Sequence, residues 1–473
     1  MRKLFFISFL LSGGFLLAQG GQDSVLLFED YLALVRANHP TSTRASLLGE
    51  RANAMLLEAR GGFDPEIYVD YRDKQFENTP YYQVGEAGFR LPTTVGLEVV
   101  GGFRWANGDL LNPENKQPSV GQTFIGLNLP LLQGLLTDDN RTSRQRAALR
   151  EDWNEQLAIL LRNDLLFDAS LAYLNWVYTQ RQLQILQESL DLTETRLRQT
   201  VASFEAGDLA AIDTLETYVQ LVSRQAEILA ADAQERVARL AVEQQLWMAG
   251  GQTIDVDPEA LAISMDAARL HPLLVENWTV AALASHPAIA QLNYQQQDLR
   301  IEERLKRQKL LPKLDFKYQF LASGLDFTST LPSNGEGTSF SDILLQDNSW
   351  GIGFQMPLFF RAARGDLQLN IIKQQETDLY RQEKSRELEN KLRQYLEQLA
   401  LLEGQRNLLE LNVENYRRLL EAEQIDFRLG ASSVFLLNSR ENKLLEAELK
   451  LAKVLSDMLK VQASLRWVAG AWR

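Results

Sequence analysis

The stretch FEAGDLAAI (Phe204–Ile212) decides the fold, because a second stretch, FRLGASSVF (Phe427–Phe435), repeats its outline. In each, a phenylalanine is followed three positions later by a glycine, Gly207 or Gly430. Glycine readily adopts the left-handed conformation that ends an α-helix. Each stretch therefore predicts a tight turn between a long helix and a returning helix, with Asp208 in one copy and Ser432 or Ser433 in the other as helix caps.

The chain carries further matched landmarks in the same order. They are LLFEDYLALVRANHP (Leu26–Pro40) with LLVENWTVAALASHP (Leu273–Pro287), GLNLPLL (Gly126–Leu132) with GFQMPLF (Gly353–Phe359), and LWMAGG with RWVAGA. Ordered landmarks that recur once indicate a duplicated unit. We expect a first repeat at 19–250, a linker at 251–272 and a second repeat at 273–473.

Two of the three histidines precede proline at matched places, in His39–Pro40 and His286–Pro287. Asn38 and Ser285 stand where a helix cap is expected before a proline at the first helical position. Proline also biases the preceding residue away from the helical conformation. All four residues are therefore interpreted as structural corners, and no catalytic or metal-binding role is expected for the histidines.

Proline is absent between Pro130 and Pro258 and after Pro357. Because proline inside a helix costs about 3 kcal/mol, these stretches predict helices. The expected helices are short ones at 26–60 and 273–310, long ones at 131–206 and 358–429, and return helices at 209–249 and 432–468. A leucine-rich seam with steps of three, four or seven runs along the long helices and requires a partner helix. Its members are Leu183, Leu186, Leu190, Leu197, Val201, Phe204, Leu409, Val413, Tyr416, Leu420 and Phe427.

Segments 63–130 and 312–357 alternate apolar and polar residues, which is typical of strands with two different faces. In KLDFKYQF, the residues from Leu314 to Phe320 alternate with charged or polar ones. The first copy contains an additional expected hairpin at about 81–106, so the strand number per subunit, four or six, stays open. A soluble sandwich gives the same alternation. Export and aromatic apolar faces favour strands in a membrane β-barrel, pooled between copies because so few hairpins cannot close a barrel alone.

The N-terminus is typical of a secretory signal peptide over 1–18, with cleavage no later than 20. Arg2 and Lys3 precede an apolar run from Leu4 to Leu17, which is short for a membrane span. An N-terminal anchor helix is the alternative. Cysteine is absent, so neither a disulfide nor a lipid-anchoring cysteine is expected. The formal net charge of −13 disfavours nucleic-acid binding.

With its doubled His-Pro corner, doubled strand-to-long-helix junction and doubled tip, the chain resembles the TolC-like outer-membrane efflux protein family. The resemblance implies a mainly α fold with membrane strands: tandem helical hairpins form a trimeric α-barrel continuous with a shared transmembrane β-barrel. It implies an outer membrane location in a Gram-negative-type bacterium, with a long periplasmic extension. It also implies a homotrimer in contact with outer-membrane lipid, a periplasmic adaptor protein and an inner-membrane pump.

Carried over residue by residue, the resemblance implies two adaptor-facing tips. They are Gly207, Asp208, Leu209 and Ala210, and Gly430, Ala431, Ser432 and Ser433. Asp213 matches an acidic position that the family uses near its closed aperture. The second tip departs from the common pattern, since Ser432 replaces arginine, Leu436 replaces aspartate and Phe427 replaces tyrosine. Leu436 is therefore expected either to line a constriction that closes by dewetting or to pack in the core.

The leading functional interpretation is a passive exit duct of a tripartite efflux or type I secretion system. Such a duct needs no enzyme activity, metal or cofactor, and the sequence contains no phosphate-binding glycine loop or metal-ligand spacing. The rival interpretation is an exported coiled-coil spacer or tether with a small soluble β-domain.

Overall fold

A computed structural model describes residues 25–257, 261–262, 286–324 and 347–472. The expected signal peptide, the expected cap Ser285 and the start of the second short helix lie outside these residues. Within them the chain divides into two compact units. Unit 1 contains 25–39, 168–257, 261–262 and 401–460, and unit 2 contains 40–167, 286–324, 347–400 and 461–472. Each unit takes segments from both expected repeats, and the division into two repeats stays a prediction.

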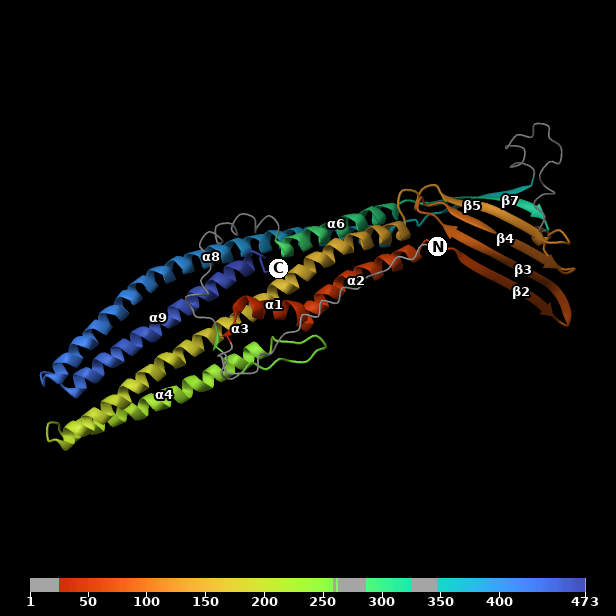
Figure 1. Cartoon of the computed structure of the whole chain (residues 1–473). Helices are drawn as coiled ribbons and strands as arrows, with labels where there is room; N and C mark the ends of the chain where they lie inside the picture. The colour runs from red at the N-terminus through yellow and green to blue at the C-terminus, as the bar shows by residue number, and fades with distance from the viewer. Residues whose placement is uncertain (1–24, 258–260, 263–285, 325–346, 473) are drawn as a thin grey trace, which may run out of the picture. The chain divides into compact units, whose positions relative to one another are not determined.

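Helices dominate the described chain (Figure 1). They are α1 (Phe28–Asn38), α2 (Pro40–Gly61), α3 (Asp139–Glu205), α4 (Ala211–Glu243), α6 (Pro287–Gln308), α8 (Arg361–Arg428) and α9 (Val434–Val468), with a 3-10 turn at Pro113–Asn115. The long helices begin later than the expected residues 131 and 358. Gly134, with φ +93°, and the turns at 131–137 delay α3, whereas Phe360, with φ +47°, precedes α8.

Unit 1 contains the ends of two helical hairpins, α3–α4 and α8–α9, which Figure 1 shows as antiparallel pairs. Its core includes Ile185 and Leu186 of α3 packed with Ala231 of α4 and with Leu445 and Ala452 of α9. A short parallel pair, β1 (Val25–Leu26) with β6 (Leu261–Ala262), belongs to the same unit. The helices therefore bury a seam shared by both hairpins.

The expected leucine seam is correct for part of its length. Leu186, Val413 and Leu420 are buried, but Val201 and Phe204 are exposed. Toward the tip, the residues that α3 buries are Thr193, Arg196 and Thr200. The seam prediction followed the apolar residues and missed that this part of the interior is polar.

Unit 2 contains one antiparallel sheet with the order β2-β3-β4-β5-β7-β8. Its strands are β2 (Glu66–Phe76), β3 (Thr79–Pro92), β4 (Glu98–Asn107), β5 (Gln122–Pro130), β7 (Lys313–Ser323) and β8 (Asn348–Gln355). β3 and β4 form a hairpin in the region of the expected inserted hairpin, with a turn in which Thr93 N donates to Leu97 O at 2.9 Å. β5 pairs directly with β7, so strands from both expected repeats lie in one sheet.

Candidate functional site

The two tip turns have the same hydrogen bonds. Gly207 N donates to Phe204 O at 2.9 Å, and Gly430 N donates to Phe427 O at 3.0 Å. In each tip the next residue donates to the carbonyl five positions earlier, from Asp208 to Ser203 at 2.9 Å and from Ala431 to Asp426 at 2.8 Å. This pattern is the Schellman motif, which satisfies the last carbonyls of a helix. The tip glycines have φ +87° and φ +73°, as the sequence predicted for a left-handed residue.

We expect Gly430→Ala to destabilise the chain by about 1 to 2 kcal/mol, because an L-residue is strained in the left-handed region. A Cβ at Gly430 meets no atom of the rest of the chain within 4 Å, so the loss comes from the local backbone conformation and not from a clash with a neighbouring side chain. Gly365 is the matched control: it is exposed within α8, a Cβ there also meets nothing within 4 Å, and no positive φ is found there. Gly365→Ala should raise stability, since alanine favours helix. Thermal unfolding of both variants checks the prediction, and equal effects would contradict it.

The cap of the second returning helix, Ser433, is one of the two expected residues, whereas the cap of the first differs from the expected Asp208. Ala210, and not Asp208, is the N-cap of α4, and the Asp213 carboxylate accepts a hydrogen bond from Ala210 N at 3.1 Å. In the second tip Ser433 Oγ accepts from Leu436 N at 3.2 Å. A capping box contains both of these bonds in one turn. Each tip has only one of the two bonds. Asp213 therefore stabilises the start of α4 through a side-chain hydrogen bond that Leu436, at the equivalent position of α9, cannot form.

Ser432 does not cap α9 but donates to the carboxylate of Glu423, which Arg440 also contacts at 3.3 Å. Leu436 is 37% exposed, whereas its neighbour Leu437 is buried. Core packing within the chain is therefore not the role of Leu436. Phe427 is half-buried, and Leu209 lies in the first tip turn.

The buried polar side chains behind the tips form a network between the hairpins. The Arg196 guanidinium donates to Glu441 and, at 3.4 Å, to Asn438 Oδ1. All three side chains are buried. Burial raises the pKa of Glu441, and this effect outweighs the opposing influence of the Arg196 charge. Sequence periodicity missed this network because it favoured Leu197, which is only half-buried.

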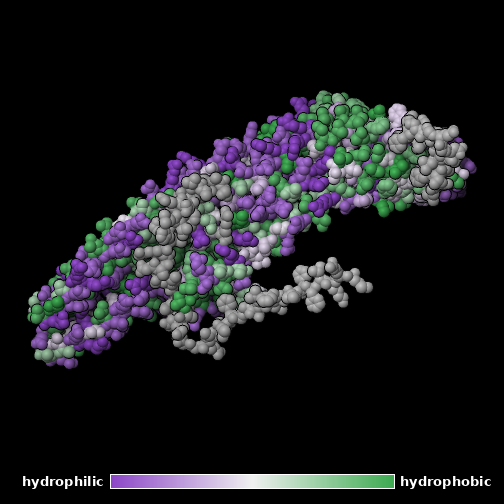
Figure 2. Space-filling view, turned by 45° about the horizontal axis from the view of Figure 1, so that its top comes forward, coloured by the Kyte–Doolittle hydropathy of each residue, from purple (hydrophilic) through white to green (hydrophobic). Residues whose placement is uncertain are grey.

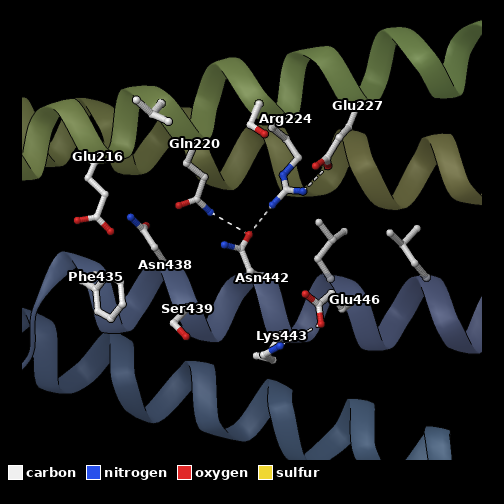
Figure 3. Close-up of a pocket in the computed structure, with 14 residues that line it drawn as sticks. Glu216, Gln220, Arg224, Glu227, Phe435, Asn438, Ser439, Asn442, Lys443 and Glu446 are labelled. Carbon is white, nitrogen blue, oxygen red and sulfur yellow. Dashed lines mark hydrogen bonds and ion pairs between the residues drawn. The ribbon is translucent and has the colours of Figure 1, made fainter.

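A groove of about 700 Å³ lies between α4 and α9 (Figure 3). Arg224 extends from α4 and donates to Glu227 on the same helix at 2.5 Å and to Asn442 of α9 at 2.7 Å. Gln220 adds a bond to the same Asn442 oxygen at 3.2 Å. The groove is lined mostly by polar side chains that tie the two hairpins together.

The sheet of unit 2 has one apolar and one polar face. On the apolar face, Ile67 of β2 pairs with Phe89 of β3. Leu127 of β5 pairs with Tyr318 of β7, and Tyr318 pairs in turn with Trp350 of β8. Much of this face is exposed, and its most exposed residue, Ile67, is 84% exposed. Figure 2 shows apolar side chains gathered over the part of unit 2 that carries the sheet. On the other face, Arg104 Nε donates to Glu86 at 2.8 Å, and the Tyr68 hydroxyl donates to the same carboxylate at 2.6 Å.

The His-Pro residues occupy the ends of helices. His39 is extended between α1 and α2, which Pro40 begins. His286 itself, in place of the expected preceding residue, is the N-cap of α6, and its Nδ1 accepts from Ala288 N at 3.1 Å. In the first copy the expected cap, Asn38, is instead the last residue of α1. Burial, with a contribution from the Lys384 charge, lowers the pKa of His286 to about 4.

Neutral His286 keeps a free lone pair on Nδ1, which accepts the hydrogen bond from Ala288 N that caps α6. The other described histidine, His39, packs against Trp247 in a T-shaped ring pair with centroids 6.1 Å apart. Within the described residues, no group of three or more His, Asp or Glu side chains could hold a metal ion. Across the same residues, no helix combines the length and the apolar character needed to cross a membrane.

Residues 278–471 match the family model described as outer membrane efflux protein. The chain resembles the outer membrane efflux proteins. This match, together with the structural ones, confirms the resemblance expected from the doubled tips and corners, and it confirms the expected outer membrane location. A comparison with curated proteins found no match.

Solved structures of outer membrane channels have the same fold. The Campylobacter jejuni CmeC outer membrane channel matches with a TM-score of 0.62 and 13% identity, over 94% of this chain and 85% of that chain. The Vibrio cholerae outer membrane protein VceC gives a TM-score of 0.63 and 11% identity, over 94% and 96% of the two chains. The open-state MtrE outer membrane channel of Neisseria gonorrhoeae matches with a TM-score of 0.63 and 12% identity, over 94% of this chain and 88% of that chain. Together with the family match, these likenesses support an efflux channel.

Proposed function

We propose that the chain is the passive exit duct of a tripartite efflux or type I secretion system. In this proposal three copies form an α-barrel from their helical hairpins, continuous with a β-barrel to which each copy contributes the sheet of unit 2. The observation that carries the proposal is the apolar, exposed face of that sheet, backed by a polar face. One chain leaves this apolar face uncovered, and membrane lipid is the medium that suits it.

The polar face supports a water-filled interior. Arg104 contacts both Glu86 and Gln319, at 2.8 Å and 3.1 Å, so strands β3, β4 and β7 share one polar cluster. Charged side chains that pair along a sheet suit contact with water and not with hydrocarbon. Within the proposal, the tips around Gly207 and Gly430 face a periplasmic adaptor protein, which links the duct to an inner-membrane pump. Asp213, Phe427 and Leu436 are proposed to line the aperture there.

The proposal assigns the chain no catalytic role and no cofactor, and it places selection of the cargo with the pump. The rival is an exported spacer with a soluble β-domain. The rival predicts that the sheet face is covered by protein and that the chain stays monodisperse in water. The proposed duct has a face that only lipid or detergent can cover.

Purification in detergent followed by mass measurement and planar-bilayer recording tests the proposal. We expect a particle containing three copies and single-channel conductance. A chain that stays monomeric and soluble without detergent, and that conducts no ions, would establish the spacer instead.

A further inference from the structure

The sheet of unit 2 contains more strands than the helices of that unit lead into. α2 leads into β2, β5 leads into α3, α6 leads into β7, and β8 leads into α8. Strands β3 and β4 connect only to other strands, and they lie between β2 and β5 (Figure 1). The sheet therefore contains one hairpin, β3–β4, that has no helix pair of its own.

The helices that lead into the sheet lie side by side in one row. α2 packs against α3 through a small apolar cluster. Arg146 of α3 donates to Asp298 of α6 at 2.8 Å, and Gln374 of α8 donates to Glu303 of α6 at 2.8 Å. The row is thus α2-α3-α6-α8, in the same order as the strands β2, β5, β7 and β8 to which these helices connect.

The β3–β4 hairpin widens the sheet where the helices stay together. Beside the sheet, Asn140 of α3 still donates to Gly62 O, just after α2, at 2.6 Å. With neighbouring axes about 9 Å apart, the four helices of the row occupy about 36 Å. In a barrel with strands about 4.8 Å apart and tilted by about 40°, six strands occupy about 38 Å of circumference and four occupy about 25 Å. The hairpin thus makes the sheet as wide as the helical row.

The hairpin has the same two faces as the rest of the sheet. On the polar face, Glu86 of β3 accepts from Tyr68 of β2 and from Arg104 of β4. Arg104 also donates to Gln319 of β7, so the hairpin is tied to strands on both sides of it. On the apolar face, Phe89 of β3 is 38% exposed. β3 has 14 residues and β4 has 10, and a membrane strand needs about 9 to 11. The hairpin is therefore part of the membrane wall.

The sheet has two edges at which copies can join. Within the described residues, β2 pairs only with β3, and β8 pairs only with β7. β2 runs away from its helix and β8 runs towards its helix, so β2 of one copy and β8 of the next meet as an antiparallel pair. Three copies of the six-stranded sheet then give eighteen strands.

We propose that the membrane barrel has eighteen strands and a lumen wide enough for a partly folded polypeptide. The inference rests on the proposed homotrimeric duct and adds the size class of its cargo. With side chains about 5 Å deep on the inner face, eighteen strands enclose a lumen about 26 Å across, and twelve strands would enclose one about 14 Å across. One helix with its side chains is about 10 to 12 Å wide, so a pair of packed helices passes only the wider lumen.

Thiol labelling measures this width, because the natural chain contains no cysteine. The test variant is Lys317→Cys. Lys317 is exposed on the polar face and lies opposite Asn128 of β5. The control is Ile352→Cys on the apolar face, where lipid excludes a water-soluble reagent. Intact cells that carry either variant are treated with maleimide polymers of graded diameter, since the outside solution meets only the outer mouth of the barrel. A gel shift of the chain reports labelling, and unfolding in detergent must make both thiols reactive.

A shortened chain provides the matched comparison. Deleting residues 79–107 from Lys317→Cys removes β3 and β4 and leaves β2 and β5 as antiparallel neighbours. We expect the widest polymer that labels Lys317→Cys to be about twice as wide in the full chain as in the shortened one. Equal limits in the two chains would overturn the inference. If the shortened chain does not assemble, the full chain decides alone: a limit closer to the wider of the two lumens supports the inference, and one closer to the narrower overturns it.

The control separates this inference from the proposed duct. If polymers of every width label the full-length Lys317→Cys and Ile352→Cys variants alike, the sheet is not the wall of a membrane barrel, and both the duct and the inference fail. If Ile352→Cys stays unlabelled while Lys317→Cys reacts only with narrow polymers, the duct stands and the eighteen-stranded lumen is wrong.

Discussion

Arg196→Ala should destabilise unit 1 by about 3 to 5 kcal/mol, because it removes one partner of a buried ion pair and leaves the other without a countercharge. Both side chains of the Arg196–Glu441 pair are buried, and Arg196 also donates to Asn438. Thermal unfolding followed by circular dichroism measures the loss. Arg198, two residues away on α3, donates only to Thr195 within the exposed surface of the same helix, so Arg198→Ala is the control and should change little.

Glu441→Gln should also destabilise unit 1, because it leaves the buried Arg196 guanidinium without a countercharge, but by less than Arg196→Ala, since the amide oxygen still accepts from the guanidinium. Burial raises the pKa of Glu441 above its ordinary value of 4.5. The folded state therefore favours the protonated form, and the stability linked to this group is present below pH 4.5 and lost as pH rises through the raised pKa. The native chain should gain stability relative to Glu441→Gln as pH falls from neutral towards 4.5. A difference that does not change with pH, or that has the opposite sign, would show that Glu441 is ionised throughout.

The tips could be predicted from the sequence because a local rule fixes them. A left-handed residue must end each long helix, and glycine adopts that conformation without strain, so Gly207 and Gly430 mark the turns. The starts of the long helices were placed too early because absence of proline permits a helix but does not begin one. At the first of these starts Gly134, also with positive φ, keeps the preceding segment out of the helix.

The polar interior behind the tips could not be predicted, because periodicity counts apolar residues and treats a threonine or arginine as solvent-facing. Thr193, Arg196 and Thr200 follow steps of three and four, as a core stripe does, but the burial of Arg196 becomes favourable only through its partners on α9, Asn438 and Glu441. Those partners are far away in the sequence. The cap at His286 was assigned one residue too early for a related reason, since the imidazole Nδ1 is an unusual capping acceptor.

Ile352→Lys should prevent stable insertion of the sheet into a bilayer. Ile352 lies on β8 opposite Phe316, on the apolar face, and is 61% exposed. A lysine on the lipid face of a membrane strand costs about 2 to 4 kcal/mol near the middle of the bilayer. The face was predicted from period-two alternation alone. Its exposure in the single chain is what makes lipid the expected neighbour.

Ser349→Lys is the matched control, because Ser349 lies on the same strand but pairs with Gln319 on the polar face. We expect the two variants to differ in the fraction of chain recovered in a detergent-resistant folded form after reconstitution into vesicles, with Ile352→Lys greatly reduced and Ser349→Lys near the native level. Equal recovery would mean that protein and not lipid covers the apolar face. The reverse order would mean that the polar face meets lipid, which the Arg104–Glu86 pair makes physically unfavourable, because both charges would then have to leave water.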